Sequence, residues 1–141
     1  MNLLPGIQSS ASAMQVERIR SEVIAQNIAN ANSTKAEGGK PYQRQVVKFE
    51  TFLQEKIGAN SEAVPQLVSV AKIMKDNKAP RMVPQPGHPD ADANGMVAYP
   101  NVNIHEEMAD LIASSRAFEA NLAVIKSSRA LTLQSLSIGR H

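Results

Sequence analysis

Four residues in the middle of the chain have the types and spacing of a calcium-binding loop. Asp90, Asp92, Asn94 and Gly95 form the pattern D-x-D-x-N-G, with which an EF-hand loop begins. The twelfth position of such a loop needs a bidentate Glu, and here it is Asn101, after a proline-rich segment that cannot form the required helix. Asp and Asn also favour turns, and glycine supplies a positive φ. We therefore expect a turn that leads through a short extended segment into the next helix, and no calcium site.

Other patterns typical of catalysis or cofactor binding are missing from the sequence. His88, His105 and His141 lack the spacing of a metal site, and neither a G-x-S-x-G elbow nor a glycine-rich phosphate loop occurs. The chain has no Cys, which excludes disulfides and Cys-ligated metals. We expect no enzyme, no catalytic residue, no metal, no cofactor and no small-molecule substrate.

The charge pattern is mildly basic, with a formal net charge of +2. The basic run Lys72, Lys75, Lys78 and Arg81 has no interleaved aromatic residue, so it does not indicate stacking on nucleic-acid bases. A solvated face is the favoured interpretation of this run, with an anion-binding patch as the alternative. The N-terminal residues lack the features of a secretory signal, so any export is expected to use a route without a cleaved signal peptide.

Residues 1–33 are predicted to form a long helix, because neither Pro nor Gly occurs from Ile7 to Ile28. On a helical wheel its apolar residues form two stripes, where an ordinary surface helix has one. One stripe contains Val16, Ile19 and Val23, and the opposite one contains Ile7, Ala11, Met14, Ala25 and Ile28. Two stripes predict contacts on two sides of the helix, some of them with other subunits.

Residues 34–100 are predicted to be an extended insert with a small β part. Val47, Phe49 and Thr51 alternate with polar residues, and the segment 65–75 places Val68 and Val70 on one face. Two such strands separated by a polar linker predict a hairpin, which must rest on the helices or on a neighbour. Five prolines within residues 80–100 predict an extended and irregular segment.

Residues 101–141 are predicted to form a second long helix, capped by Asn103 with Glu106 at the capping-box position. Its seam has the three- and four-residue steps of a coiled coil: Ile104, Met108, Leu111, Ser115, Phe118, Leu122, Ile125, Arg129, Thr132 and Leu136. A second stripe contains Val124, Leu131 and Ile138. The predicted fold is mainly α with a small β part, in which the two terminal helices pair as one coiled-coil-like domain around the β-hairpin and the proline-rich insert.

The asparagines near the end of the first helix have two interpretations. Asn27, Asn30 and Asn32 either terminate the helix or bond across subunits or to the partner helix, because each amide both donates and accepts.

The segment SEVIAQNIANANSTKAEGGKPYQRQ, with Asn27 and Asn30 at its centre, resembles the N-terminal motif of bacterial flagellar rod and hook proteins. The segment from Gly87 to Arg140 is similar to the C-terminal part of proximal-rod members of that family. The resemblance implies a structural subunit of the basal-body rod, exported by the flagellar type III apparatus and assembled helically in the periplasm. Its implied role is to transmit torque from the motor ring towards the hook.

The resemblance also implies the partners: other copies of the chain and other rod proteins, with the membrane ring and export apparatus as indirect ones. Nucleic acid is not among them. The alternatives are a coiled-coil adaptor and a calcium-regulated binding module. The predicted subunit interface consists of Met14, Val16, Ile19, Val23, Asn27, Ile28, Asn30, Met108, Leu111, Phe118, Leu122, Ile125, Leu131 and Leu136.

Overall fold

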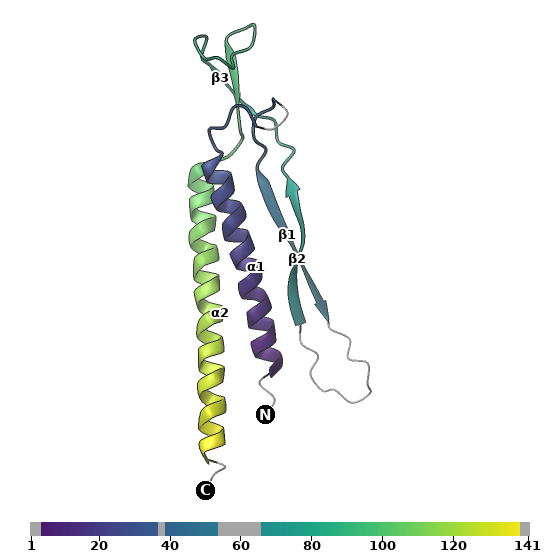
Figure 1. Cartoon of the computed structure of the whole chain (residues 1–141), viewed down its shortest axis with the longest axis vertical. Coiled ribbons are helices and arrows are strands. Elements are labelled where there is room, and N and C mark those ends of the chain that lie inside the picture. The colour runs from purple at the N-terminus through teal and green to yellow at the C-terminus, as the bar shows by residue number, and fades with distance from the viewer. Residues whose placement is uncertain (1–3, 37–38, 54–65, 139–141) are drawn as a thin grey trace.

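A computed structural model of the chain describes residues 4–36, 39–53 and 66–138, and it shows an elongated molecule (Figure 1). Two long helices lie side by side, and a β-hairpin runs along α1 on the side away from α2. The fold is thus mainly α with a small β part, as predicted. Its elements are α1 (Leu4–Ala29), β1 (Gln45–Leu53), β2 (Gln66–Lys75), β3 (Arg81–Pro84), β4 (Met96–Tyr99) and α2 (Ile104–Ile138).

One asparagine side chain caps the start of α2, and another bonds to the backbone at the end of α1. At the start of α2 the backbone N–H of His105 donates to Oδ1 of Asn103 at 3.1 Å, which confirms the predicted cap. At the end of α1 the amide of Asn30 donates to the carbonyl oxygen of Gln26 at 2.9 Å. The first helix therefore ends at Ala29, and residues 30–32 form a turn. Neither described helix has a stretch long and apolar enough to cross a membrane.

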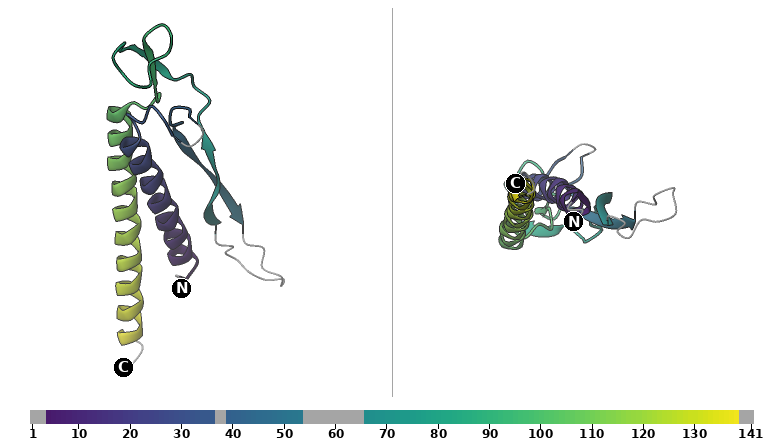
Figure 2. Two further views of the ribbon diagram at one scale, coloured as in Figure 1. Left: turned by 45° about the horizontal axis from the view of Figure 1, so that its top comes forward. Right: turned by 90° about the horizontal axis from the view of Figure 1, so that it is seen from below.

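The two helices run antiparallel and pack on each other where α1 ends and α2 begins. Contacts between Asn27 and Glu107, and between Glu17 and Ser114, show that the numbering falls along α1 as it rises along α2. Figure 2 shows the helices diverging towards the N-terminus of α1. Because α2 is longer than α1, with 35 residues against 26, its last turns extend beyond its partner (Figure 1).

The buried face of α2 differs from the predicted seam. The fully buried residues of α2 are Glu107 and Ser114, each one position before the predicted seam residues Met108 and Ser115. Met108 is instead 52% exposed. The two faces share Leu111, Phe118 and Ile125 and differ in the positions between them, so the buried face is rotated by roughly 50° around the helix axis from the predicted seam. The predicted seam was wrong at these positions, where polar residues whose contacts are described below occupy the buried face of α2.

The predicted β-hairpin is confirmed. β1 pairs with β2 in an antiparallel register from Gln45 opposite Lys75 to Leu53 opposite Gln66, with a bulge next to Phe49. The hairpin is fastened to α1 near its far end, where the backbone N–H of Val68 donates to Oγ of Ser12 at 3.2 Å. The predicted linker between the strands lies in residues 54–65, outside the described residues.

The proline-rich segment is more regular than predicted. β3 and β4 form a second antiparallel pair, in which Arg81 lies opposite Tyr99 and Pro84 opposite Met96. Val97 of this pair is fully buried. Most of the prolines lie just outside the two strands, and Pro84 is the last residue of β3, so the missing N–H groups interrupt little of the ladder. The expectation of an irregular segment holds only for the residues between and around the strands.

Candidate functional site

A polar cluster with two buried members, Asn27 and Glu107, joins α1, β1 and α2 at the base of the hairpin. We call Asn27, Tyr42, Arg44, Gln45 and Glu107 the Asn27 cluster. The Asn27 amide donates to the carbonyl oxygen of Gln45 at 2.9 Å and to Oε2 of Glu107 at 3.0 Å. Its Oδ1 accepts from the Gln45 N–H and from the Tyr42 hydroxyl, both at 2.9 Å. All four bonds available to the amide are therefore made within the chain.

The Glu107 carboxylate is the buried charge of the cluster, with the residue only 1% exposed. Its Oε1 accepts from Nε of Arg44 at 2.6 Å, while Oε2 accepts from Asn27. Arg44 also lies 3.9 Å from carboxylate oxygens of Asp76 and Asp110. A buried carboxylate is tolerated only when it is paired and hydrogen-bonded, and both conditions are met here. The pairing connects the start of α2 to the segment that leads into β1.

The phenol of Tyr42 is affected by the same environment. Burial raises the pKa of Tyr42 above its ordinary value, and the negative charge of Glu107 raises it further. The neutral hydroxyl is thereby retained as a donor to Asn27 over the usual pH range.

A second set of polar contacts lies further along the helix pair, and we call Glu17, Arg20, Ser21, Asp110 and Ser114 the polar ladder. Ser114 is fully buried. Its Oγ lies 2.7 Å from Oε2 of Glu17 and 2.9 Å from Oγ of Ser21. Arg20 and Asp110 pair at 3.3 Å. The helix interface around Ser114 is thus held by polar contacts.

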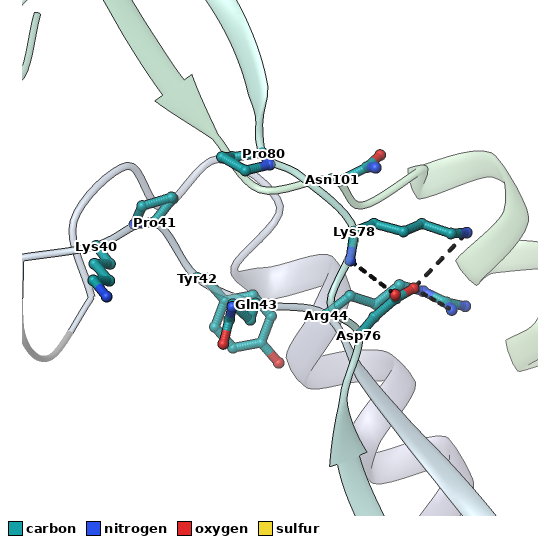
Figure 3. Close-up of a pocket in the computed structure, with 9 residues that line it drawn as sticks. All are labelled: Lys40, Pro41, Tyr42, Gln43, Arg44, Asp76, Lys78, Pro80 and Asn101. Carbon is teal, nitrogen blue, oxygen red and sulfur yellow. Dashed lines mark hydrogen bonds and ion pairs between the residues drawn. The ribbon is translucent and has the colours of Figure 1, made fainter. Parts of the chain in front are cut away.

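A pocket of roughly 130 Å³ opens beside the Asn27 cluster (Figure 3). Its lining includes Tyr42, Arg44, Asp76 and Lys78, which come from the segments flanking the hairpin. Asp76 lies between the two cations, 3.9 Å from Arg44 and 3.8 Å from Lys78. Because these charges pair with one another, the pocket has the arrangement of a structural junction and lacks the free acid–base pair that catalysis needs.

The segment with the calcium-loop pattern is a turn built from its own side chains. Oδ1 of Asp92 accepts from the N–H groups of Asn94 and Met96 at 2.8 and 2.9 Å, and Gly95 has a φ of 71°. Asp90 points elsewhere: it accepts from the Thr34 hydroxyl at 2.8 Å and from the Lys35 ammonium at 2.9 Å. These bonds fasten the turn to the segment after α1, and they confirm the predicted turn.

The basic run lies on β2, on the segment that follows it and on the first residue of β3. All four side chains are exposed, as a solvated face requires. Lys72 lies opposite Lys48 in the hairpin. Lys78 pairs with Asp76, and the Arg81 guanidinium lies 5.8 Å from the centre of the Tyr99 ring.

The structure distributes the predicted interface residues over three environments. Val16, Val23 and Asn27 are buried against their own chain. Met108, Leu131 and Leu136 are exposed. The remainder are half-buried: Met14, Ile19, Ile28, Asn30, Leu111, Phe118, Leu122 and Ile125.

The sequence interpretation missed Tyr42, Arg44, Glu107 and Ser114 as residues that position the helices. The available signal was the seven-residue spacing of Glu107 and Ser114, continued by Asn121, which is interleaved with Leu111, Phe118 and Ile125. A seam with polar residues at every second position is not found by a search for apolar residues.

The helix pair corresponds to the two segments that match known protein families. Residues 7–35 match the family described as "Flagella basal body rod protein", and residues 93–138 match the one described as "Flagellar basal body rod FlgEFG protein C-terminal". The two matches thus define the class as flagellar basal-body rod proteins.

Individual relatives match over nearly the whole length. The chain is 35% identical to the flagellar basal-body rod protein FlgC of Borreliella burgdorferi, with 98% of both chains covered. It is 36% identical to FlgC of Yersinia enterocolitica and 32% identical to FlgC of Bacillus subtilis, each with 99% of this chain and 100% of the relative covered. The chain therefore belongs to the FlgC family of flagellar basal-body rod proteins. It is a structural subunit of the rod and not an enzyme, as its family indicates.

Proposed function

We propose that this chain forms the proximal part of the flagellar rod together with other copies of itself and with other rod proteins. In this proposal the subunits assemble helically in the periplasm and transmit torque from the motor ring towards the hook. The flagellar export apparatus and the membrane ring are indirect partners. The observation that supports this proposal is the exposed apolar surface of α2.

That surface is extensive within the described residues. The exposed apolar residues of α2 include Ile112, Val124 and Leu131, and the last turns add Leu133, Leu136 and Ile138. Apolar stripes of this length on a monomer mark interfaces with other molecules. A rod-shaped subunit with different contacting faces forms an open helix when the rotation between copies does not close.

The proposed interface retains the predicted residues, with roles that depend on their burial. Met108, Leu131 and Leu136 are accessible to a neighbour, and the half-buried Phe118 and Leu122 lie at the edge of the accessible surface. Val16, Val23 and Asn27 contact their own chain and would reach a neighbour only after rearrangement. We further propose that the helix pair behaves as a coiled-coil-like unit and that the insert fills gaps between subunits.

The proposal is tested by an in-frame deletion of the gene followed by electron microscopy of isolated basal bodies. We expect basal bodies that retain the membrane rings but lack rod and hook, and we expect the parent chain supplied in trans to restore both. A deletion strain that builds normal flagella and swims would contradict the proposal.

A matched pair of variants then tests the exposed face. Leu131→Ser removes an apolar side chain from the exposed end of α2, and Ser137→Ala changes a residue of the same region without removing apolar surface. We expect the first variant to swim poorly at normal protein levels and the second to swim normally. Equal swimming of both would remove residue 131 from the proposed interface.

A further inference from the structure

The rotation of α2 about its own axis determines which of two overlapping faces packs against α1: the apolar seam predicted from the sequence, or the face that is buried in the structure. The predicted seam and the observed buried face share Leu111, Phe118 and Ile125, and they differ in which neighbouring residues lie inward. If Met108 faced α1, the interface would gain an apolar side chain. Instead Glu107 is buried, and Met108 and Ile112 are 52% and 56% exposed. Hydrophobic burial alone would favour the opposite choice.

The polar contacts explain this choice. Glu107 pairs with Arg44 at 2.6 Å, and Ser114, seven residues later on the same side of α2, bonds to Glu17 at 2.7 Å. A rotation of α2 towards the predicted seam would turn both groups away from their partners. It would leave the half-buried Arg44 and the buried Asn27 without the carboxylate, at a cost that exceeds the gain from one methionine.

We propose that Glu107 and Ser114 are orienting residues. They fix the rotation of α2 so that the apolar stripe Ile104, Met108 and Ile112 is turned away from α1 and is offered to a helix of a neighbouring rod subunit. The stripe has four-residue steps, which form one of the ridges by which helices pack on each other. All three of its residues are exposed on the described chain. The identity of the partner rests on the proposed function, whereas the orientation does not.

The orientation is measured by thiol labelling, because the parent chain contains no cysteine. Ile112→Cys reports on the outward face, and Ala117→Cys reports on the half-buried inward face. Each reporter is placed in a chain, called the apolar-anchor chain, that carries Arg44→Leu, Glu107→Leu and Ser114→Ala. These changes make both orienting residues apolar. Arg44 is replaced together with Glu107 so that no buried charge is left unpaired. The control carries Arg116→Leu, Glu106→Leu and Ser115→Ala, which change the same residue types at exposed positions.

We expect position 112 to label several times faster than position 117 in the parent and in the control. In the apolar-anchor chain this ratio should fall at least about fivefold, since each lost net hydrogen bond of ~1 kcal/mol shifts a population by roughly that factor. The fall must come from slower labelling at 112 together with faster labelling at 117. An unchanged ratio would overturn the proposal, because apolar packing would then set the rotation. Labelling of both positions at the rate of an unfolded chain would also overturn it, because the anchors would then hold the fold and not its orientation.

The partner is tested separately in cells. Ile112→Ser should impair swimming, while Ala113→Ser, an exposed neighbour, should not. Normal swimming of Ile112→Ser in an organism whose deletion strain is non-motile would refute the stripe as an interface and leave the rod function standing. If the deletion strain itself swims, the proposed function fails, and the labelling result still decides whether Glu107 and Ser114 orient α2.

Discussion

Replacement of Asn27 by alanine is the most informative single perturbation of this chain. The side chain makes two bonds to the backbone of Gln45, one to Tyr42 and one to Glu107, and it is only 1% exposed. Alanine is compatible with the helix and creates no clash, so the change removes these bonds and little else.

The expected loss follows from the groups that the substitution leaves behind. The N–H and carbonyl of the half-buried Gln45 lose their partner, and one oxygen of the buried Glu107 loses a donor. Leaving a buried polar group unsatisfied costs about 1–3 kcal/mol, and the effects within one network are not additive. We therefore expect the free energy of unfolding to fall by about 3–5 kcal/mol, a large share of the ~5–15 kcal/mol typical of a domain.

The assay is urea unfolding followed by circular dichroism, with Asn30→Ala as the matched control. Asn30 lies three residues later in the same sequence motif, and its half-buried side chain makes two local bonds, donating to the Gln26 carbonyl and accepting from the Ser33 hydroxyl. Its replacement should cost about 0.5–1.5 kcal/mol. The two asparagines are thus chemically identical and structurally different.

A difference of less than about 1 kcal/mol between the two variants would refute this reasoning, because the Asn27 bonds would then contribute no more than the local bonds of Asn30. Normal stability of Asn27→Ala combined with a loss of assembly would favour the other interpretation of the motif, in which the asparagine bonds across subunits.

Three further outcomes are expected. Gly95→Ala should destabilise the chain by ~1–2 kcal/mol in thermal unfolding, because Gly95 has a positive φ and an added Cβ would lie 3.1 Å from Cβ of Pro86. Gly87→Ala should be neutral, since an added Cβ there meets open space. The stability advantage of the parent over Tyr42→Phe should be complete below pH ~10 and vanish as pH rises further, because burial raises the pKa of the folded-state phenol. The advantage of the parent over Asp90→Asn should be present above pH ~4 and be lost on further acidification, because the bond from Lys35 lowers the pKa of the Asp90 carboxyl. An advantage that does not change with pH in either titration would contradict the corresponding assignment.

Much of the fold follows from local patterns in the sequence. The absence of Pro and Gly from residues 7–28 was enough to predict α1, and the Asn103 cap located the start of α2. The alternation around Phe49 predicted β1, and Asp92 with Gly95 predicted the turn. In each case the residues that determine the structure are neighbours in the sequence, so short-range chemistry is sufficient.

The candidate site was harder to predict, because its residues lie far apart in the chain. Asn27 meets Gln45 and Glu107, eighteen and eighty positions away. The side-chain amide of Asn27 bonds to the Gln45 backbone through both its N–H and its C=O, as the backbone of an adjacent strand would. No local sequence pattern predicts this pairing. The same holds for β3 and β4, where the prolines discouraged a strand although the pair needs few of the missing donors.

The distribution of polar and apolar residues between the two sides of α2 explains how one chain serves both folding and assembly. Buried polar contacts contribute less to stability than apolar packing, but they discriminate strongly between alternative arrangements. Here they lie between α1 and α2, where Glu107 and Ser114 specify one orientation. The apolar residues that would have stabilised the monomer, such as Met108 and Ile112, remain exposed. The polar contacts within the subunit thus specify the orientation of α2, while its exposed apolar residues remain available to the neighbouring rod subunits proposed above.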